Sequence, residues 1–327
     1  MIALGGLASL HAWIIFSVLT ANAIGGQAPG SGELRSPGGV IRLKNFSRIS
    51  SDLEKGETVL TGVGNPVSID DTGTGLTLTA QSMSCTLHQN AKGEYVIDHA
   101  TLSGDAHVVM DSRIAAQTKA IRAKLAKSPA TENAPNSSVV HLDSDTVEYE
   151  AEKDETVLTF PKPVAYAESV EGKTTKVQAG KPIDVSFTQE THARGSNGRF
   201  TVASPVDPSN RELKPRTGHL GGPVKFNVHR VETPITLNGT AIAPTETKID
   251  GVGDRLDADF LKSGEPTVTL EGNVRVDGDG TGFSGTVTGT RAILTLDRQS
   301  LRPKSYDFLG TPAKTVIKTL KTTGGSR

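Results

Sequence analysis

The feature that most constrains this chain is a strand-like unit that occurs twice, over residues 100–110 and again over residues 268–276. In both copies every second residue is apolar or glycine, and the residues between are mostly polar. This period of two marks a β-strand with one face buried and one face in water. A glycine holds the same place in each copy, Gly104 and Gly272, and we expect it on the buried face, where the strand bends or a neighbour comes close. A strand unit that recurs predicts a stacked β-architecture rather than a catalytic scaffold.

The composition agrees with a β-protein that has many turns. The 327 residues include 35 glycines but only 4% aromatic residues, and 35% are hydrophobic. The net charge of −1 provides no global field to attract nucleic acid. A single cysteine, Cys85, excludes an internal disulfide. It alternates with apolar neighbours, which favours a small core residue over a reactive thiol.

The N-terminus is apolar from residue 2 to residue 20 and ends at Ala21-Asn22-Ala23, the small-residue pattern that a signal peptidase cleaves. Residues 1–23 are therefore either a cleaved signal peptide, which here lacks its usual positive start, or an uncleaved membrane anchor. Both alternatives carry the rest of the chain out of the cytoplasm. Residues 24–37 are rich in Gly, Ser and Pro and predict a flexible linker.

The remaining chain divides by its strand signals. Residues 38–190 predict a first β-module, interrupted near residues 114–127 by an Ala- and Lys-rich stretch with apolar residues at helical spacing. Residues 191–254 have many Pro and Gly and predict an irregular connection with short strands. Residues 255–327 predict a second β-module, which could also include strands from residue 220 onward.

The recognisable catalytic and metal-binding motifs are absent or poor, so we expect no enzyme, no metal and no cofactor. The run from Asp277 to Gly282 resembles a calcium loop only faintly, and a hairpin turn is the simpler interpretation. The basic residues between Lys119 and Lys127 could contact anionic headgroups, but a solvated helix face is the simpler interpretation.

A longer pattern combines these strands. An L-x-G-x-[AV]-x-V strand alternates with an Ala-containing strand, in residues 76–85 leading to 102–108, in residues 142–164, and in residues 270–312. This sequence pattern resembles that of the OstA-like family. The family's β-jellyroll occurs in the lipopolysaccharide-transport proteins LptA and LptC and in the N-terminal domain of LptD. The resemblance covers about two-thirds of the chain.

The resemblance implies an all-β fold, a twisted and partly open OstA-like β-jellyroll in two modules. It implies a non-enzymatic periplasmic protein that binds and transports lipopolysaccharide or a related lipid in an apolar groove. It also implies edge-strand pairing with other jellyroll transport proteins and possible inner-membrane association. A secreted structural or adhesive β-protein without a lipid ligand is the alternative. The groove candidates are the inward positions of the repeated unit: Leu102, Ala106, Val108, Leu270, Val274 and Val276.

Overall fold

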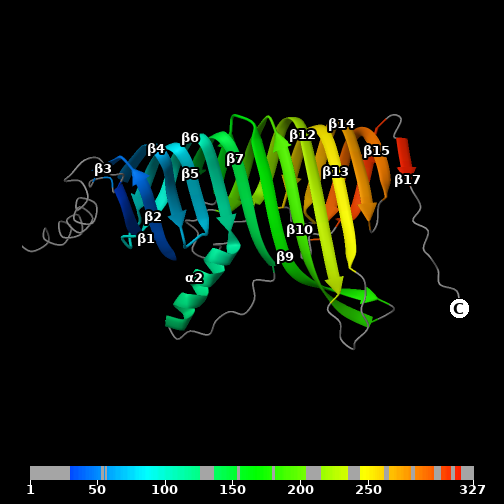
Figure 1. The fold of residues 1–327 in the computed structure, drawn as a ribbon, viewed down its shortest axis with the longest axis horizontal. Helices are drawn as coiled ribbons and strands as arrows, with labels where there is room; N and C mark the ends of the chain where they lie inside the picture. The colour runs from blue at the N-terminus through cyan, green and yellow to red at the C-terminus, as the bar shows by residue number, and fades with distance from the viewer. Residues whose placement is uncertain are drawn as a thin grey trace, which may run out of the picture. The chain divides into compact units, whose positions relative to one another are not determined.

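The structure is a computed structural model of the whole chain. The residues it describes are 30–52, 55, 57–125, 136–152, 155–178, 181–203, 215–234, 244–260, 265–280, 284–297, 303–310 and 314–317. The signal peptide or anchor predicted for residues 1–23 lies outside these ranges. The fold is all-β, as predicted, and the described residues include one helix. Figure 1 shows the long strands.

The chain forms two compact units, and neither is continuous in sequence. Unit 1 comprises Met1–Glu132, Leu142–Pro161 and Thr201–Lys214, and unit 2 comprises Asn133–His141, Lys162–Phe200 and Pro215–Arg327. Strands β7 (Asn136–Ala151) and β11 (Asn197–Ala203) contribute residues to both.

Unit 1 is built from antiparallel strands in which each long strand pairs with the next along the chain. They are β1 (Gly30–Ser36), β2 (Gly39–Phe46), β3 (Arg48–Asp52), β4 (Glu57–Asp71), β5 (Leu76–Gln89), β6 (Tyr95–Asp111) and β8 (Glu155–Phe160). The pairs are β1 with β2, β2 and β3 with β4, β4 with β5, β5 with β6, and β7 with β8. The interior is sealed by inward aliphatic side chains with no exposed surface: Ile41, Leu60, Ile69, Leu78, Leu102 and Val108.

Unit 2 continues the same plan with longer strands. They are β9 (Val164–Gln178), β10 (Lys181–Gly195), β12 (Pro215–Pro234), β13 (Thr245–Asp259), β14 (Thr267–Gly280), β15 (Gly285–Leu296), β16 (Pro303–Leu309) and β17 (Lys314–Ile317). All are antiparallel: β9 to β10, β10 to β12, then β12 through β15 in sequence, with β16 and β17 both against β15.

The repeated glycine marks a bend in each long strand. The register of β5 on β6 slips between Thr79 and Ser82, opposite Gly104, and that of β14 on β15 slips between Glu271 and Val274, around Gly272. Both glycines have left-handed backbone angles, with φ of 74° and 94°, which side chains rarely adopt. The predicted bend is therefore present. The predicted burial is wrong, because the extra residue of the bulge turns each glycine to a half-exposed position.

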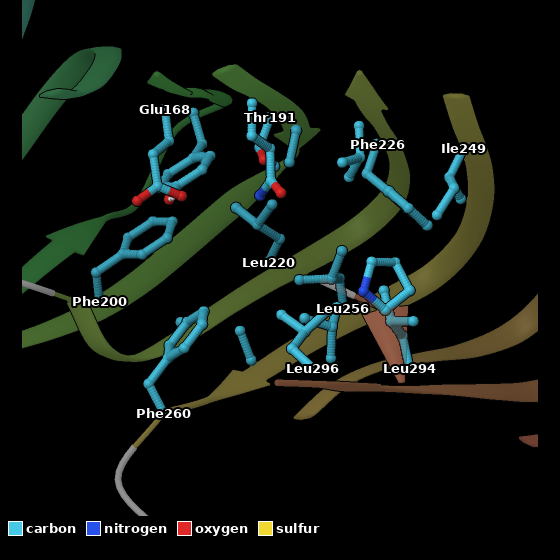
Figure 2. A pocket seen from close by; sticks show the side chains of 18 residues that line it. Glu168, Thr191, Phe200, Leu220, Phe226, Ile249, Leu256, Phe260, Leu294 and Leu296 are labelled. Atoms are coloured by element: carbon cyan, nitrogen blue, oxygen red, sulfur yellow. Dashed lines mark hydrogen bonds between the residues drawn. The ribbon is translucent and has the colours of Figure 1, made fainter. Parts of the chain in front are cut away.

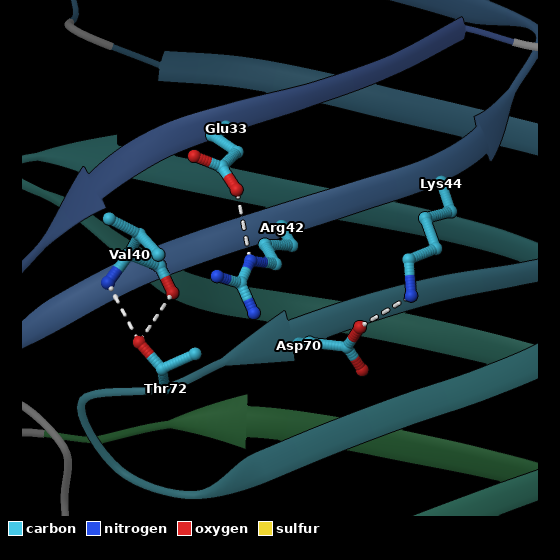
Figure 3. Close-up of polar contacts among 6 residues, drawn as sticks. All are labelled: Glu33, Val40, Arg42, Lys44, Asp70 and Thr72. Atoms are coloured by element: carbon cyan, nitrogen blue, oxygen red, sulfur yellow. Dashed lines mark hydrogen bonds and ion pairs between the residues drawn. The ribbon is translucent and has the colours of Figure 1, made fainter. Parts of the chain in front are cut away.

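The outer faces carry cross-strand ion pairs. Figure 3 shows two of them in unit 1, where Arg42 Nε donates to Glu33 Oε1 at 2.9 Å and Lys44 Nζ lies 3.2 Å from Asp70 Oδ2. In unit 2, Arg255 and Arg291 both contact Glu271, at 3.0 and 3.3 Å. Such exposed pairs contribute about 0–1 kcal/mol each. Their main consequence is a wet outer face, which fixes the opposite face of each strand as the interior.

One outer pair makes a pH-dependent prediction. His107 Nδ1 lies 2.6 Å from Asp143 Oδ1, and this hydrogen bond, aided by the charges of Asp143 and Asp105, raises the pKa of His107. The protonated imidazole stabilises unit 1 fully below the unfolded-state pKa of about 6.5, and the gain is lost as pH rises through the folded-state value. NMR titration should place the pKa of His107 above that of a free imidazole. Asp143→Asn should lower it, and an unchanged value would contradict the pairing.

Four boundary predictions meet the structure differently. The short helix near residues 114–127 is present as α2 (Ser112–Leu125). The flexible linker predicted for residues 24–37 is wrong over its described part, because β1 pairs with β2 through its backbone. Its small polar side chains supply little burial, so composition alone suggested a linker.

The irregular connection predicted for residues 191–254 is also wrong where the structure describes it, because β11, β12 and β13 occupy most of it. The predicted first module, 38–190, contains strand β9 and most of strand β10, which belong to unit 2. Strand pairing decides which unit a strand belongs to, and the local sequence does not encode that pairing. Among the described residues, no helix has the length and apolar character needed to cross a membrane.

Candidate functional site

A cavity of about 100 Å³ lies inside unit 2. Strands β9 to β13 supply most of its lining, and β14, β15 and β16 supply the rest. Figure 2 shows the labelled side chains pointing toward one another from these strands. The large apolar members are Phe200, Leu220, Phe226, Ile249, Leu256, Phe260, Leu294 and Leu296.

The cavity is apolar because the inward positions of neighbouring strands carry apolar residues that lie opposite one another. Leu220 on β12 stands opposite Leu256 on β13, which stands opposite Leu270 on β14. Beside them the ring of Phe200 stacks on that of Tyr166, with centroids 5.7 Å apart and planes 8° from parallel. Stacked aromatic pairs contribute about 0.5–1.5 kcal/mol beyond their burial. This wall is therefore well fixed.

Other parts of the lining reach solvent. Leu220 is 1% exposed, whereas Phe226, Phe260, Val268 and Leu294 are only half-buried. Apolar surface that remains in contact with water costs about 25 cal/mol per Å² relative to burial. An apolar ligand that covered about 100 Å² of this surface would therefore gain about 2.5 kcal/mol.

The apolar lining ends at a buried polar cluster on β10 and β12. Arg230 Nε donates to Glu232 Oε1 at 2.9 Å, and its Nη1 donates to Gln189 Oε1 at 3.0 Å. The guanidinium also lies 3.9 Å from the ring centroid of Phe187. Arg230 and Glu232 are each 3% exposed. Because Gln189 also lines the cavity, this cluster sets where the apolar interior stops.

A second polar contact lies on β9. The phenol of Tyr166 donates to Glu168 Oε2 at 2.9 Å, and both residues line the cavity. Burial raises the pKa of Tyr166 well above its usual range, and the neighbouring Glu168 raises it further. Tyr166 therefore stays a neutral hydrogen-bond donor at any physiological pH.

The residues predicted to line a groove all point inward, but none lines this cavity. Leu102, Ala106 and Val108 lie in the sealed interior of unit 1 with no exposed surface. Leu270, Val274 and Val276 are 3–4% exposed on β14 of unit 2. The structure thus places them in two separate units. Their contact with a lipid stays a prediction.

Sequence reasoning missed the cavity because much of its lining comes from residues 191–254. Leu220 and Phe226 lie on β12, where the glycine pair at 221–222 and the buried charges of Arg230 and Glu232 interrupt the apolar alternation. The usable signal was the alternating run from Val224 to Val228. Read as a strand, it would have placed Phe226 on an inner face.

A cavity in unit 1 is much smaller, about 10 Å³, and is lined in part by Asp71, Tyr95 and Tyr149. That is about the volume of one water. Among the described residues, no group of three or more His, Cys, Asp or Glu side chains is arranged to hold a metal ion.

No protein-family model, no curated protein and no solved structure matches this chain. The geometry of unit 2 is therefore what a functional assignment has to rest on.

Proposed function

We propose that this chain is a non-enzymatic lipid-binding protein that holds an acyl chain in the cavity of unit 2. The observation that carries this proposal is an apolar cavity whose lining includes large side chains that are only half-buried. These are Phe226, Phe260 and Leu294. A core whose only role is stability closes these side chains off from water, as the interior of unit 1 does. Ligand pockets in proteins are concave and mostly apolar, with a few placed polar groups.

The volume limits what enters. The cavity is smaller than the ~150 Å³ cavity that is known to hold benzene. It therefore suits the end of one acyl chain. Most of a lipid with several chains would lie outside the cavity. The lining residues Tyr166, Gln189 and Thr191 offer hydrogen bonds to a polar group near that chain.

The resemblance to the OstA-like family supports the finer proposal. In that family a twisted, partly open β-jellyroll carries lipopolysaccharide across the periplasm, and end strands pair with the next protein. Long antiparallel strands bent at glycine bulges are compatible with such a roll. On this proposal the lipid is lipopolysaccharide or a related lipid, the location is periplasmic, and the short strands β16 and β17 are candidates for edge pairing.

Filling the cavity tests the proposal. Ala258 lines it, and Ala258→Phe should weaken binding of an anthroyloxy-labelled fatty acid on the order of tenfold or more, because the new ring occupies the ligand's volume. Val252→Phe is the matched control, since Val252 lies on the same strand with 37% exposure on the outer face. Fluorescence titration of both variants and the parent protein measures the difference.

Two outcomes contradict the proposal. Equal binding by the parent protein and both variants would place the label outside the cavity. Failure of the folded parent protein to bind either the fatty acid or labelled lipopolysaccharide would favour the alternative, a structural or adhesive β-protein without a lipid ligand.

A further inference from the structure

Helix α2 is anchored at its start by Asp111 of unit 1. It follows directly on β6, and Asp111 Oδ1 accepts a hydrogen bond from the backbone N of Arg113 at 2.9 Å, which is the geometry of an N-terminal cap. The Arg113 guanidinium also donates to this carboxylate, at 2.8 Å to Oδ2, and holds the pKa of Asp111 below its usual range. From there Figure 1 shows α2 running away from the strands of its own unit.

No described side chain of α2 is buried. Residues 112–118 and 120 cover every direction around the helix axis, and all are exposed or half-exposed. Ile114, the large apolar residue among them, is 38% exposed. A helix of this length is marginal in water without tertiary packing. The described part of α2 therefore lacks the apolar contact that usually stabilises a short helix.

The charged residues of α2 are all basic. From Ser112 to Leu125 it contains four Lys or Arg residues and no Asp or Glu, in a chain whose net charge is −1. Positions 114, 121 and 125, which are Ile, Ile and Leu, recur at helical spacing and share one side of the helix. Basic positions lie on both sides of that stripe, at 113 and 124 on one and at 122 on the other.

We propose that α2 docks on the surface of an anionic phospholipid bilayer. Cations on both sides of a stripe of apolar positions fit a bilayer interface, where the headgroups meet the charges and apolar side chains enter the acyl boundary. A nucleic acid or an acidic protein segment would use the charges and leave Ile114 in water. The proposal stands independently of the cavity of unit 2, because α2 belongs to unit 1.

Vesicle flotation with the full chain tests this proposal. We expect binding to vesicles of phosphatidylcholine with a quarter phosphatidylglycerol, little binding to phosphatidylcholine alone, and release by salt. The triple variant Lys119→Glu, Arg122→Glu, Lys124→Glu should bind on the order of 100-fold more weakly, because each basic residue near an anionic surface contributes several-fold. Amides of α2 should also gain protection from hydrogen exchange when vesicles are added.

The matched control reverses three exposed lysines on the strands and turns of the two units: Lys92→Glu, Lys173→Glu, Lys225→Glu. It has the same net charge as the α2 variant and should keep vesicle binding. Equal loss in both variants would show a non-specific charge effect and overturn the docking site. Binding that survives the α2 reversals would assign it to another segment, such as the apolar N-terminus. Tighter retention of a DNA oligonucleotide than of vesicles would also overturn it.

Discussion

Replacing Glu232 by Gln should lower the free energy of unfolding of unit 2 by about 3–5 kcal/mol, because it leaves the Arg230 guanidinium charged inside a dry interior. Both residues are 3% exposed and their side chains are joined at 2.9 Å, so neither can turn to water without moving β12. Urea denaturation followed by far-UV circular dichroism measures the loss. A change below about 1 kcal/mol, the value of an exposed pair, would show that water reaches the cluster.

Two further variants isolate the buried charge. Replacing the pair together, Arg230→Met with Glu232→Leu, should cost much less than Glu232→Gln alone, because neither buried charge remains. Glu246→Gln removes an outer-face carboxylate that contacts Lys248 at 2.8 Å, and it should change stability little. If the double variant is the least stable of the three, the pair contributes net stability and the account of its cost is wrong.

The second large effect concerns the phase of the repeated strand unit. Leu270→Asp places a charge on the inner face of β14, and we expect it to cost several kcal/mol or to prevent folding of unit 2. Glu271→Gln changes the next residue on the outer face, where the carboxylate contacts Arg255 and Arg291, and it should cost about 1 kcal/mol or less. Urea titration of the purified variants, or soluble yield where a variant does not fold, separates them.

Equal tolerance at these two positions would mean that the alternation does not define an inside and an outside. Val274→Asp serves as a second inner-face variant on the far side of the bulge. It should behave as Leu270→Asp does. If it behaves as Glu271→Gln does, the bulge at Gly272 has shifted the phase of the strand, and the inner face changes within β14.

The local sequence pattern was enough to predict the elements whose two faces differ sharply in polarity. The alternation around Leu102 and Leu270 predicted inward positions, and both are buried. The Ala- and Lys-rich stretch was correctly predicted as a helix, since nothing in it alternates with period two. The glycines at 104 and 272 were correctly expected at bends, because only a residue without a side chain adopts their backbone angles at low cost.

Pattern failed where tertiary pairing decides the structure. Strand β12 buries Arg230 and Glu232, which pair with each other in the interior. In the sequence, two charged residues predict an outer face of the strand. Strand β1 has no apolar face and is held by its backbone pairing with β2. The cavity itself depends on which strands face one another across unit 2. No single strand carries that information, so the groove was predicted on Val274 and Val276 rather than on Leu220 and Phe226.

Site-specific photo-crosslinking tests the central claim, that unit 2 holds an acyl chain, most directly. A photoreactive amino acid at Leu294, a half-buried position in the cavity, should form an adduct with a radiolabelled fatty acid or lipopolysaccharide. The same amino acid at Val252, on the outer face, should form none. Adducts at Leu294 alone would support lipid binding in the cavity. A folded protein that yields no adduct at Leu294, or equal adducts at both positions, would contradict it.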